Sequence, residues 1–356
     1  MRSADTVFGW DVGGAHVKAC RMRHGRVVDV VQWPCALWQG LDRLEQVLDA
    51  AAARWPDLRA AQHAVTMTGE MVDLFADRAD GVTRLAAALA ARLADDPAHV
   101  ALLAGDRWCA THEAAAHWAE IASANWLATA RHVALALPRG DALLVDIGST
   151  TTDLIALRDG RVLTAARTDA QRLASGELVY HGVVRTPLCA FARRIVWRGA
   201  EHNVMNEWFA NAADVYRLTG ELDPAHDQHP AADGADKTPA ATRRRLARMI
   251  GLDAHEASDV EWLAFAHAWR AQQVAELRGQ LERVVARHGL REGTTVVAAG
   301  CGAFLVDELL PAGLKRLGYA RGIAPFDADA PPAVAVWAQV CAPSVAVAAL
   351  YERECR

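Results

Sequence analysis

A glycine turn rich in hydroxyl groups and flanked by two acids is the stretch most suited to chemistry. In residues 142–157 an apolar run ends at Asp146, a turn follows, and a second apolar run begins after Asp153. This pattern predicts strand, turn and strand. A turn that combines backbone N–H groups with hydroxyls suits a phosphate, and the two carboxylates could hold Mg²⁺ beside it. The alternative is an ordinary polar hairpin loop. The turn residues are Gly148, Ser149, Thr150, Thr151 and Thr152.

The chain carries this pattern twice. Residues 11–14 read Asp-Val-Gly-Gly, and residues 146–149, 135 positions later (146 − 11), read Asp-Ile-Gly-Ser. The same shift superposes residues 25–27 on 160–162, and both triplets read Gly-Arg-Val. Two copies in one register predict a fold with two related halves. The first copy contributes Asp11, Gly13, Gly14, His16 and Lys18 as candidate site residues.

Two further turns follow predicted strands. Residues 294–305 read as a strand, the turn Gly300-x-Gly302 and the start of a helix, where glycines permit close approach of a ring or a phosphate. In residues 64–71 a strand runs into Gly-Glu, which turns Glu70 toward a cleft or places it at a helix N-terminus. Asn125, in a helix expected over 113–130, is either a ligand contact or a satisfied polar group in a helix crossing.

The second half holds several polar candidates with two interpretations each. The segment 168–187 suits a cleft wall through Gly176, Glu177 and Arg185, although Glu177 could simply pair with a surface arginine, Arg172 or Arg185. A helix expected over 204–218 places Glu207, Asn211 and Asp214 on one face, for a metal or basic group or merely for solvent. Residues 223–239 are interpreted as a mobile loop.

Composition excludes some classes of protein. The chain has 356 residues and a net charge of −5, so no basic surplus indicates nucleic acid. Seven scattered cysteines favour reduced thiols over a disulfide framework. We see no signal-peptide pattern and no apolar run of about 18 residues, and therefore expect a soluble cytoplasmic protein without a membrane partner. An oligomer is compatible with the sequence.

The whole set of motifs resembles a known family. Residues 11–15, 67–70, 123–126 and 146–153, with two segments between 176 and 187, resemble the hydantoinase/oxoprolinase-like proteins of tetrahydromethanopterin-linked C1 transfer. That group includes the archaeal synthase of methanofuran assembly and belongs to the superfamily of actin-like ATPases, sugar kinases and heat-shock chaperones. The resemblance covers nearly the whole chain.

The resemblance implies an α/β fold. It consists of two ribonuclease-H-like domains, with mixed sheets flanked by helices and a ligand cleft between them. The first domain is expected over 1–135, with a C-terminal helix over 344–356 packed back on it. The second is expected over 136–343, with a helical insertion at about 188–290.

The resemblance also implies a transferase of methanofuran or methylofuran biosynthesis. Such an enzyme joins an (aminomethyl)furanmethyl diphosphate to the phenol of gamma-glutamyl-tyramine or a tyramine-type acceptor, forms an aryl ether and releases diphosphate. The furanmethyl carbon can ionise because the ring delocalises positive charge, and Mg²⁺ would neutralise the leaving group. ATP is not expected to be required.

Roles for the candidate residues follow as hypotheses. Both glycine turns bind diphosphate, Asp11 and Asp146 hold Mg²⁺, and Lys18 contacts an outer phosphate oxygen. His16 or Glu177 takes the phenol proton. In the remaining pairs, Glu70 or Glu207 binds the aminomethyl group, and Arg172 or Arg185 binds the glutamyl carboxylate. Gly300 and Gly302 contact either adenosine or a furan or phenol ring.

Three other functions stay open at this point. The first is an ATP-dependent small-molecule kinase of the same superfamily. The second is an ATP-dependent hydantoinase or oxoprolinase. The third is a non-enzymatic chaperone that switches with bound nucleotide.

Overall fold

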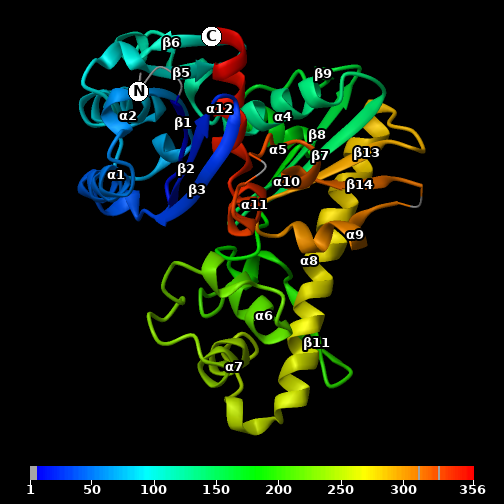
Figure 1. Cartoon of the computed structure of the whole chain (residues 1–356). Helices are drawn as coiled ribbons and strands as arrows, with labels where there is room; N and C mark the ends of the chain where they lie inside the picture. The colour runs from blue at the N-terminus through cyan, green and yellow to red at the C-terminus, as the bar shows by residue number, and fades with distance from the viewer. Residues whose placement is uncertain (1–5, 312, 328) are drawn as a thin grey trace. The chain divides into compact units, whose positions relative to one another are not determined.

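The computed structural model describes residues 6–311, 313–327 and 329–356 (Figure 1). The chain divides into two compact units. The first comprises residues 1–140, 157–162 and 318–356, and the second comprises 141–156 and 163–317.

The first unit is built on a six-stranded mixed sheet. Its strands follow the order β3-β2-β1-β4-β5-β6, with β1 antiparallel to β2 and parallel to β4. Phe8, Trp10 and Val12 of β1 enter a hydrophobic core with residues of helices α1 and α2. The alternate residues of β1 therefore point to the opposite face. The bounds are β1 (Thr6–Val12), β2 (His16–Arg23), β3 (Arg26–Pro34), β4 (Gln62–Met67), β5 (Val100–Ala104), β6 (Arg107–Ala110), α1 (Asp42–Arg54) and α2 (Arg78–Leu93).

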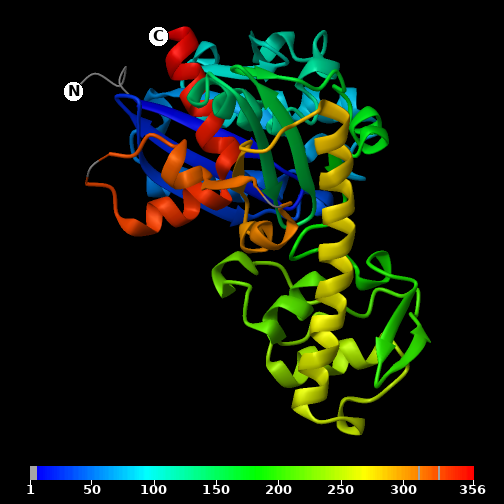
Figure 2. The same ribbon diagram turned by 90° about the vertical axis from the view of Figure 1, so that its right-hand side faces the viewer.

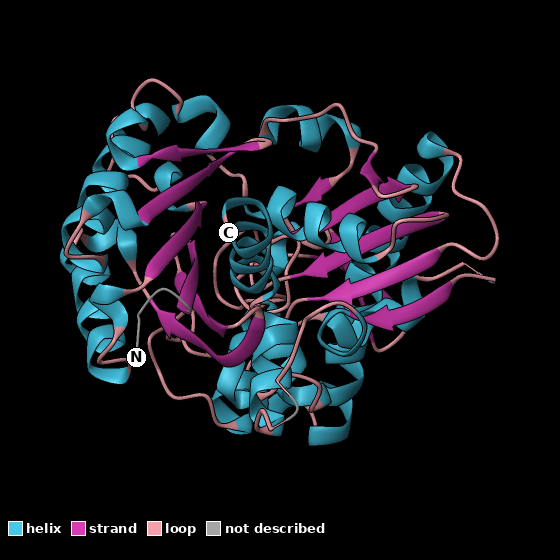
Figure 3. Ribbon diagram, turned by 45° about the horizontal axis from the view of Figure 1, so that its top comes forward, coloured by secondary structure: helices cyan, strands magenta, loops and turns pink. Residues whose placement is uncertain are grey.

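That opposite face is covered by helix α12 (Ala342–Cys355) (Figure 3). A Cβ at Gly9 of β1 would lie 2.0 Å from the Ser344 carbonyl oxygen, so this contact of helix on strand requires glycine. At the other end of α12 the Tyr351 hydroxyl donates to Gln62 Oε1 at 3.0 Å, at the start of β4. The helix therefore runs antiparallel to β1 and begins near Gly9.

The second sheet follows the order β10-β8-β7-β13-β14, and β9 pairs with β8. Strands β7 and β13 are parallel, with Asp146 opposite Ala299. A helix of 30 residues, α8 (Asp259–His288), extends along the second unit (Figure 2). The strand bounds are β7 (Asp141–Ile147), β8 (Thr152–Arg158), β9 (Arg161–Val162), β10 (Leu178–Val179), β13 (Thr295–Ala299) and β14 (Lys315–Gly318).

The remaining elements are shorter than α8, and strand β11 packs against this helix. Trp262 of α8 stacks on Trp197 of β11, with ring centroids 4.7 Å apart, and this pair belongs to the hydrophobic core of the second unit. The remaining bounds are α3 (Trp118–Ile121), α4 (Asn125–Ala136), α5 (Asp169–Ser175), β11 (Arg194–Trp197), β12 (Ala200–Asn203), α6 (Ala212–Thr219), α7 (Pro239–Arg248), α9 (Val306–Leu309), α10 (Tyr319–Gly322) and α11 (Pro332–Val340).

The predicted sequence repeat is confirmed by backbone geometry. His24 and Gly25 have φ angles of 50° and 70°, and Asp159 and Gly160 have 47° and 73°. Two successive positive φ angles are typical of a type I′ turn, whose twist suits a two-stranded hairpin. Both copies therefore make the same tight turn between their second and third strands.

Two predicted helices are wrong. The helix expected over 113–130 is interrupted between α3 and α4, because Ser123 takes a left-handed φ of 52°. The helix expected over 204–218 begins only at Ala212, since Asn211 is extended and precedes the helix. Glu207, Asn211 and Asp214 therefore do not share one helix face.

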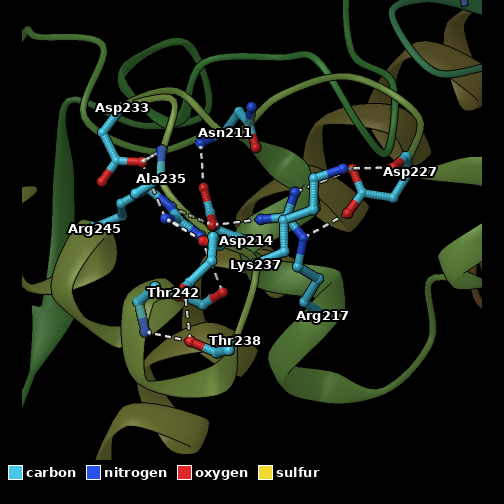
Figure 4. A network of polar contacts seen from close by, with 12 residues as sticks. Asn211, Asp214, Arg217, Asp227, Asp233, Ala235, Lys237, Thr238, Thr242 and Arg245 are labelled. Carbon is cyan, nitrogen blue, oxygen red and sulfur yellow. Dashed lines mark hydrogen bonds and ion pairs between the residues drawn. The ribbon is translucent and has the colours of Figure 1, made fainter.

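The segment 223–239 was expected to be mobile, but ion pairs fix it (Figure 4). Arg217 of α6 contacts Asp227 at 2.6 Å, and Lys237 contacts the same carboxylate at 3.0 Å. Arg245 of α7 contacts Asp233 at 3.1 Å. Burial opposes ionisation of Asp227, but the hydrogen bonds and charges of Arg217 and Lys237 outweigh it and lower the pKa of Asp227.

Asp214 connects this segment to the helices around it. Its carboxylate is fully buried and accepts from Arg217 at 2.7 Å and from Arg245 at 2.8 Å (Figure 4). Burial raises the pKa of Asp214, and the two guanidinium groups only partly offset that effect. The charge of Asp214 therefore depends on the neighbouring charges of Arg217 and Arg245.

Within the described residues, no single helix is long and apolar enough to cross a membrane. Helices α11 and α12 reach that length and apolarity only as a pair, and they are bent by 97° where they meet.

We expect Arg245→Met to destabilise the second unit by about 3–5 kcal/mol, because it leaves the buried Asp214 with one cation fewer. The check is chemical unfolding together with hydrogen exchange of residues 223–239. Arg248→Met is the matched control, since Arg248 lies 3.8 Å from Asp233 and its side chain is 50% exposed. Equal stability of the two variants would contradict the inference that the buried Asp214 needs the positive charge of Arg245.

Acid should destabilise the first unit. Burial lowers the pKa of His63 to about 3 and that of His132 to about 4. Both rings stay neutral in the folded state, whereas the unfolded chain takes up protons from about pH 6.5 downward. Their stabilising contribution is complete above about pH 6.5 and declines as the pH falls toward the two folded-state values.

The measurement is the melting temperature between pH 7.5 and pH 5. It should fall across this range, and more gently in His132→Asn, which removes one of the two groups. A melting temperature that does not change with pH would refute the expectation.

Candidate functional site

The first hairpin turn is closed by a main-chain hydrogen bond. Gly13 N–H donates to the His16 carbonyl at 2.9 Å, and a Cβ at Gly13 would lie 2.8 Å from that oxygen. A Cβ at Gly14 would lie 2.7 Å from Val72 Cγ1. Both glycines are therefore required by the tight turn and its neighbours. His16 follows the turn and is buried, at 5% exposure.

A row of polar residues crosses the first sheet next to this turn. Lys18 of β2 lies opposite Asp11 of β1, which lies opposite Thr66 of β4. Lys18 Nζ lies 3.2 Å from Asp11 Oδ2, and the Asp11 side chain is only 3% exposed. Asp11 Oδ1 and Thr66 Oγ1 are buried and have no hydrogen-bond partner among the described residues.

Glu70 is held rigidly at the end of β4. The residue is 1% exposed, and Ser123 Oγ donates to its Oε1 at 2.8 Å. Gly81 packs so closely that a Cβ there would lie 2.4 Å from the Glu70 carbonyl oxygen. The left-handed φ of Ser123 that interrupts the helix thus brings a hydroxyl to this carboxylate. Asn125 lies at the start of α4, and its Oδ1 accepts the Trp126 N–H at 2.7 Å.

The second hairpin turn has the same closure. Gly148 N–H donates to the Thr151 carbonyl at 2.8 Å, which is the counterpart of the Gly13 bond. Ser149, Thr150 and Thr151 are partly exposed. Thr152 is not available to a ligand, because it is fully buried and its hydroxyl donates to the His181 carbonyl at 2.7 Å. The predicted set of four hydroxyls is therefore reduced to three.

A loop supports this turn from behind. Arg185 N–H and Val184 N–H both donate to the Ser149 carbonyl, at 2.8 and 3.0 Å. A Cβ at Gly182 would lie 2.4 Å from the Ser149 carbonyl carbon. Gln273 of α8 fixes Gly182 by donating to its carbonyl at 2.9 Å. Sequence reasoning missed the supporting role of Gly182 and Gln273, because the loop around Gly182 indicated only a turn.

The Gly-x-Gly turn after β13 packs against the end of β7. Gly302 N–H donates to the Ile147 carbonyl at 2.8 Å. A Cβ at Gly300 would lie 2.1 Å from that carbonyl oxygen and 2.5 Å from Asp146 Oδ1. Both glycines are therefore required by close contact with β7, at the side of the Asp146 carboxylate.

Glu177 does not have the surroundings of a catalytic base. It is 1% exposed, and its Oε2 accepts from Thr164 at 2.6 Å and from Ser175 at 2.7 Å. Its Oε1 lies 2.9 Å from His288 Nε2 at the end of α8. Every carboxylate oxygen thus has a partner in the protein. Gly176 beside it ends α5 with a φ of 81°, which is a helix-capping role.

The surroundings of three other candidates are as follows. Arg172 is 2% exposed and contacts Asp153 at 2.5 Å, so it forms a buried ion pair. Glu207 lies exposed in the loop before α6. Arg185 is partly buried, and burial lowers the pKa of its guanidinium.

In the part of the chain that the structure describes, no group of three or more His, Cys, Asp or Glu side chains could hold a metal ion. A cation bound to this protein would depend on single carboxylates, water and substrate oxygens. Mg²⁺ is usually bound in this way. The buried Asp11 Oδ1, which has no hydrogen-bond partner in the described part of the chain, fits such a role.

Comparison with known proteins places the chain among enzymes of one family. It is 28% identical over 305 residues to the "(4-{4-[2-(gamma-L-glutamylamino)ethyl]phenoxymethyl}furan-2-yl)methanamine synthase" of Methanocaldococcus jannaschii, which covers 85% of this chain and 88% of the relative. A protein of the same name from Methanococcus vannielii is 29% identical over 171 residues, covering 47% of this chain and 74% of the relative.

A solved structure confirms the predicted α/β fold class. The nucleotide-free structure of acetone carboxylase aligns with 97% of this chain and 70% of its own, at a TM-score of 0.55 and 11% identity. The chain thus shares the α/β fold of that structure. The model of the Hydantoinase/oxoprolinase family matches residues 62–348, and the chain belongs to this family.

Proposed function

We propose that this protein is a transferase of methanofuran or methylofuran biosynthesis. It would join the furanmethyl carbon that bears the diphosphate to the phenol oxygen of gamma-glutamyl-tyramine or tyramine. Diphosphate is released from that carbon. The observation that carries the proposal is the similarity over 85% of the chain to a synthase whose name describes such a phenoxymethyl-furan ether.

The second hairpin turn supports a site for the leaving diphosphate. Ser149, Thr150 and Thr151 are partly exposed, while Gly182 and Gln273 hold the backbone behind them. Fixed donors placed where negative charge develops lower the barrier to departure of a leaving group.

The carboxylates at the ends of β1 and β7 are the candidates to hold Mg²⁺. Asp11 and Asp146 are each such a candidate, directly or through water. When bound, Mg²⁺ would neutralise charge on the departing diphosphate. Lys18 would hold Asp11 in place, since it already pairs with Asp11 Oδ2.

The surroundings of the other candidate residues favour one member of each pair that was proposed to contact the two organic substrates. With Glu177 fully engaged by the protein, His16 is the remaining candidate to take the phenol proton. Glu70 suits the cationic aminomethyl group better than the exposed Glu207, because a buried carboxylate binds a cation more strongly. Arg185 suits the glutamyl carboxylate better than Arg172, which is paired with Asp153.

The experiment is to incubate the pure protein and Mg²⁺ with the furanmethyl diphosphate and gamma-glutamyl-tyramine, without ATP. We expect release of diphosphate and a product with the mass of the ether. Asp11→Asn and Asp146→Asn should each lower the rate about 100-fold or more. Asp106→Asn, at an exposed residue, is the control and should not change it.

Membership of the hydantoinase/oxoprolinase family leaves an ATP-dependent hydrolase as the second candidate. ATP hydrolysis that depends on a cyclic amide, without ether formation, would replace the proposed function with that activity.

Gly182→Ala should impair diphosphate binding by the second hairpin turn. The added methyl group would lie 2.4 Å from the main chain of Ser149, which cannot yield as a flexible side chain would. We expect at least a tenfold weaker affinity for diphosphate by calorimetry. Gly279→Ala on α8 is the control, because nothing lies within 4 Å of its Cβ position. Unchanged affinity in Gly182→Ala would show that the turn does not bind diphosphate.

A further inference from the structure

We propose that Thr66 is a positioning residue for the magnesium ion. Its hydroxyl and Asp11 Oδ1 would together hold one water molecule of the ion's hydration shell. This inference rests on the proposed function, because it assumes that Mg²⁺ binds together with diphosphate.

The first observation is a pair of unsatisfied polar atoms. Thr66 is fully buried and Asp11 is 2% exposed. Neither Thr66 Oγ1 nor Asp11 Oδ1 has a hydrogen-bond partner among the described residues. Each buried polar atom without a hydrogen bond costs about 1–3 kcal/mol of stability. Two of them on neighbouring strands indicate that a bound molecule forms hydrogen bonds with both.

The second observation is their register. Asp11 and Thr66 are paired residues of the parallel strands β1 and β4. Their neighbours in sequence, Trp10 and Val12 on one strand and Val65 and Met67 on the other, all belong to the core on the opposite face. Both polar side chains therefore point to the same face of the sheet, side by side.

The bound water molecule must lie on the Thr66 side of Asp11. Lys18 occupies the other side, where its Nζ lies 3.2 Å from Asp11 Oδ2. Helix α12 covers the neighbouring row of this face, where Ser344 packs on Gly9. Because α12 runs from there toward the start of β1, the row of Asp11 lies beyond its first turn.

Hydrogen bonding permits a metal-bound water between the two atoms. A carboxylate oxygen only accepts hydrogen bonds, and a threonine oxygen can accept one. A water that donates to both of them uses both its protons and keeps its lone pairs for a cation. Bound Mg²⁺ retains several such waters, and outer-shell partners of this kind commonly change metal affinity 10–100-fold.

The test compares Thr66→Val, which keeps the shape but removes the hydroxyl, with Thr66→Ser, which keeps the hydroxyl. Calorimetry of the full chain with MgCl₂ and inorganic diphosphate gives the affinity, and thermal unfolding with and without Mg²⁺ gives stability. We expect Thr66→Val to weaken Mg²⁺ binding about tenfold or more, and Thr66→Ser by about threefold at most. Without Mg²⁺, Thr66→Val should melt at or above the wild-type temperature.

Two results would overturn the proposal. One is Mg²⁺ affinity in Thr66→Val equal to that of the wild type, which includes the case in which neither binds. The other is a melting temperature of Thr66→Val that falls as far without Mg²⁺ as with it, because the hydroxyl would then serve the fold alone. Ether formation by the wild type, measured separately, shows whether the proposed function stands when this inference fails.

Discussion

Each candidate site depends on a main-chain hydrogen bond to the last residue of a central strand. The Val12 carbonyl accepts the Thr68 N–H at 2.9 Å, and the Ile147 carbonyl accepts the Gly302 N–H at 2.8 Å. These bonds tie the turn after a parallel strand to the neighbouring hairpin. Such contact leaves little room for side chains, which is why glycines gather at these positions. The polar groups nearby can then be positioned by rigid backbone.

The two copies have diverged in how they balance charge. The position of Lys18 in the first hairpin corresponds to Asp153 in the second, 135 residues later (153 − 18). In the first copy the lysine on the same hairpin pairs with Asp11. In the second, Arg172 of α5 supplies the cation for Asp153. The related halves thus offer different chemistry, with hydroxyls exposed on one turn and an acid–lysine pair beside the other.

Local pattern was enough to predict the hairpins, their repetition and the Gly-x-Gly turn, because glycine and alternating apolar residues directly limit the backbone. It was not enough for Glu177 or for residues 223–239. The state of Glu177 depends on His288, far away in sequence, and that of residues 223–239 depends on ion pairs such as Asp233–Arg245, which the local pattern does not show. Thr66 had no signal of its own, since one threonine in a strand is ordinary. Its significance depends on Asp11 across the sheet.

Helix α8 limits which insertions and deletions evolution can accept. It contacts Trp197 through Trp262, Gly182 through Gln273 and Glu177 through His288. One residue gained or lost between these contacts would rotate one end by about 100° relative to the other. The length of the helix between these contacts should therefore be inherited unchanged.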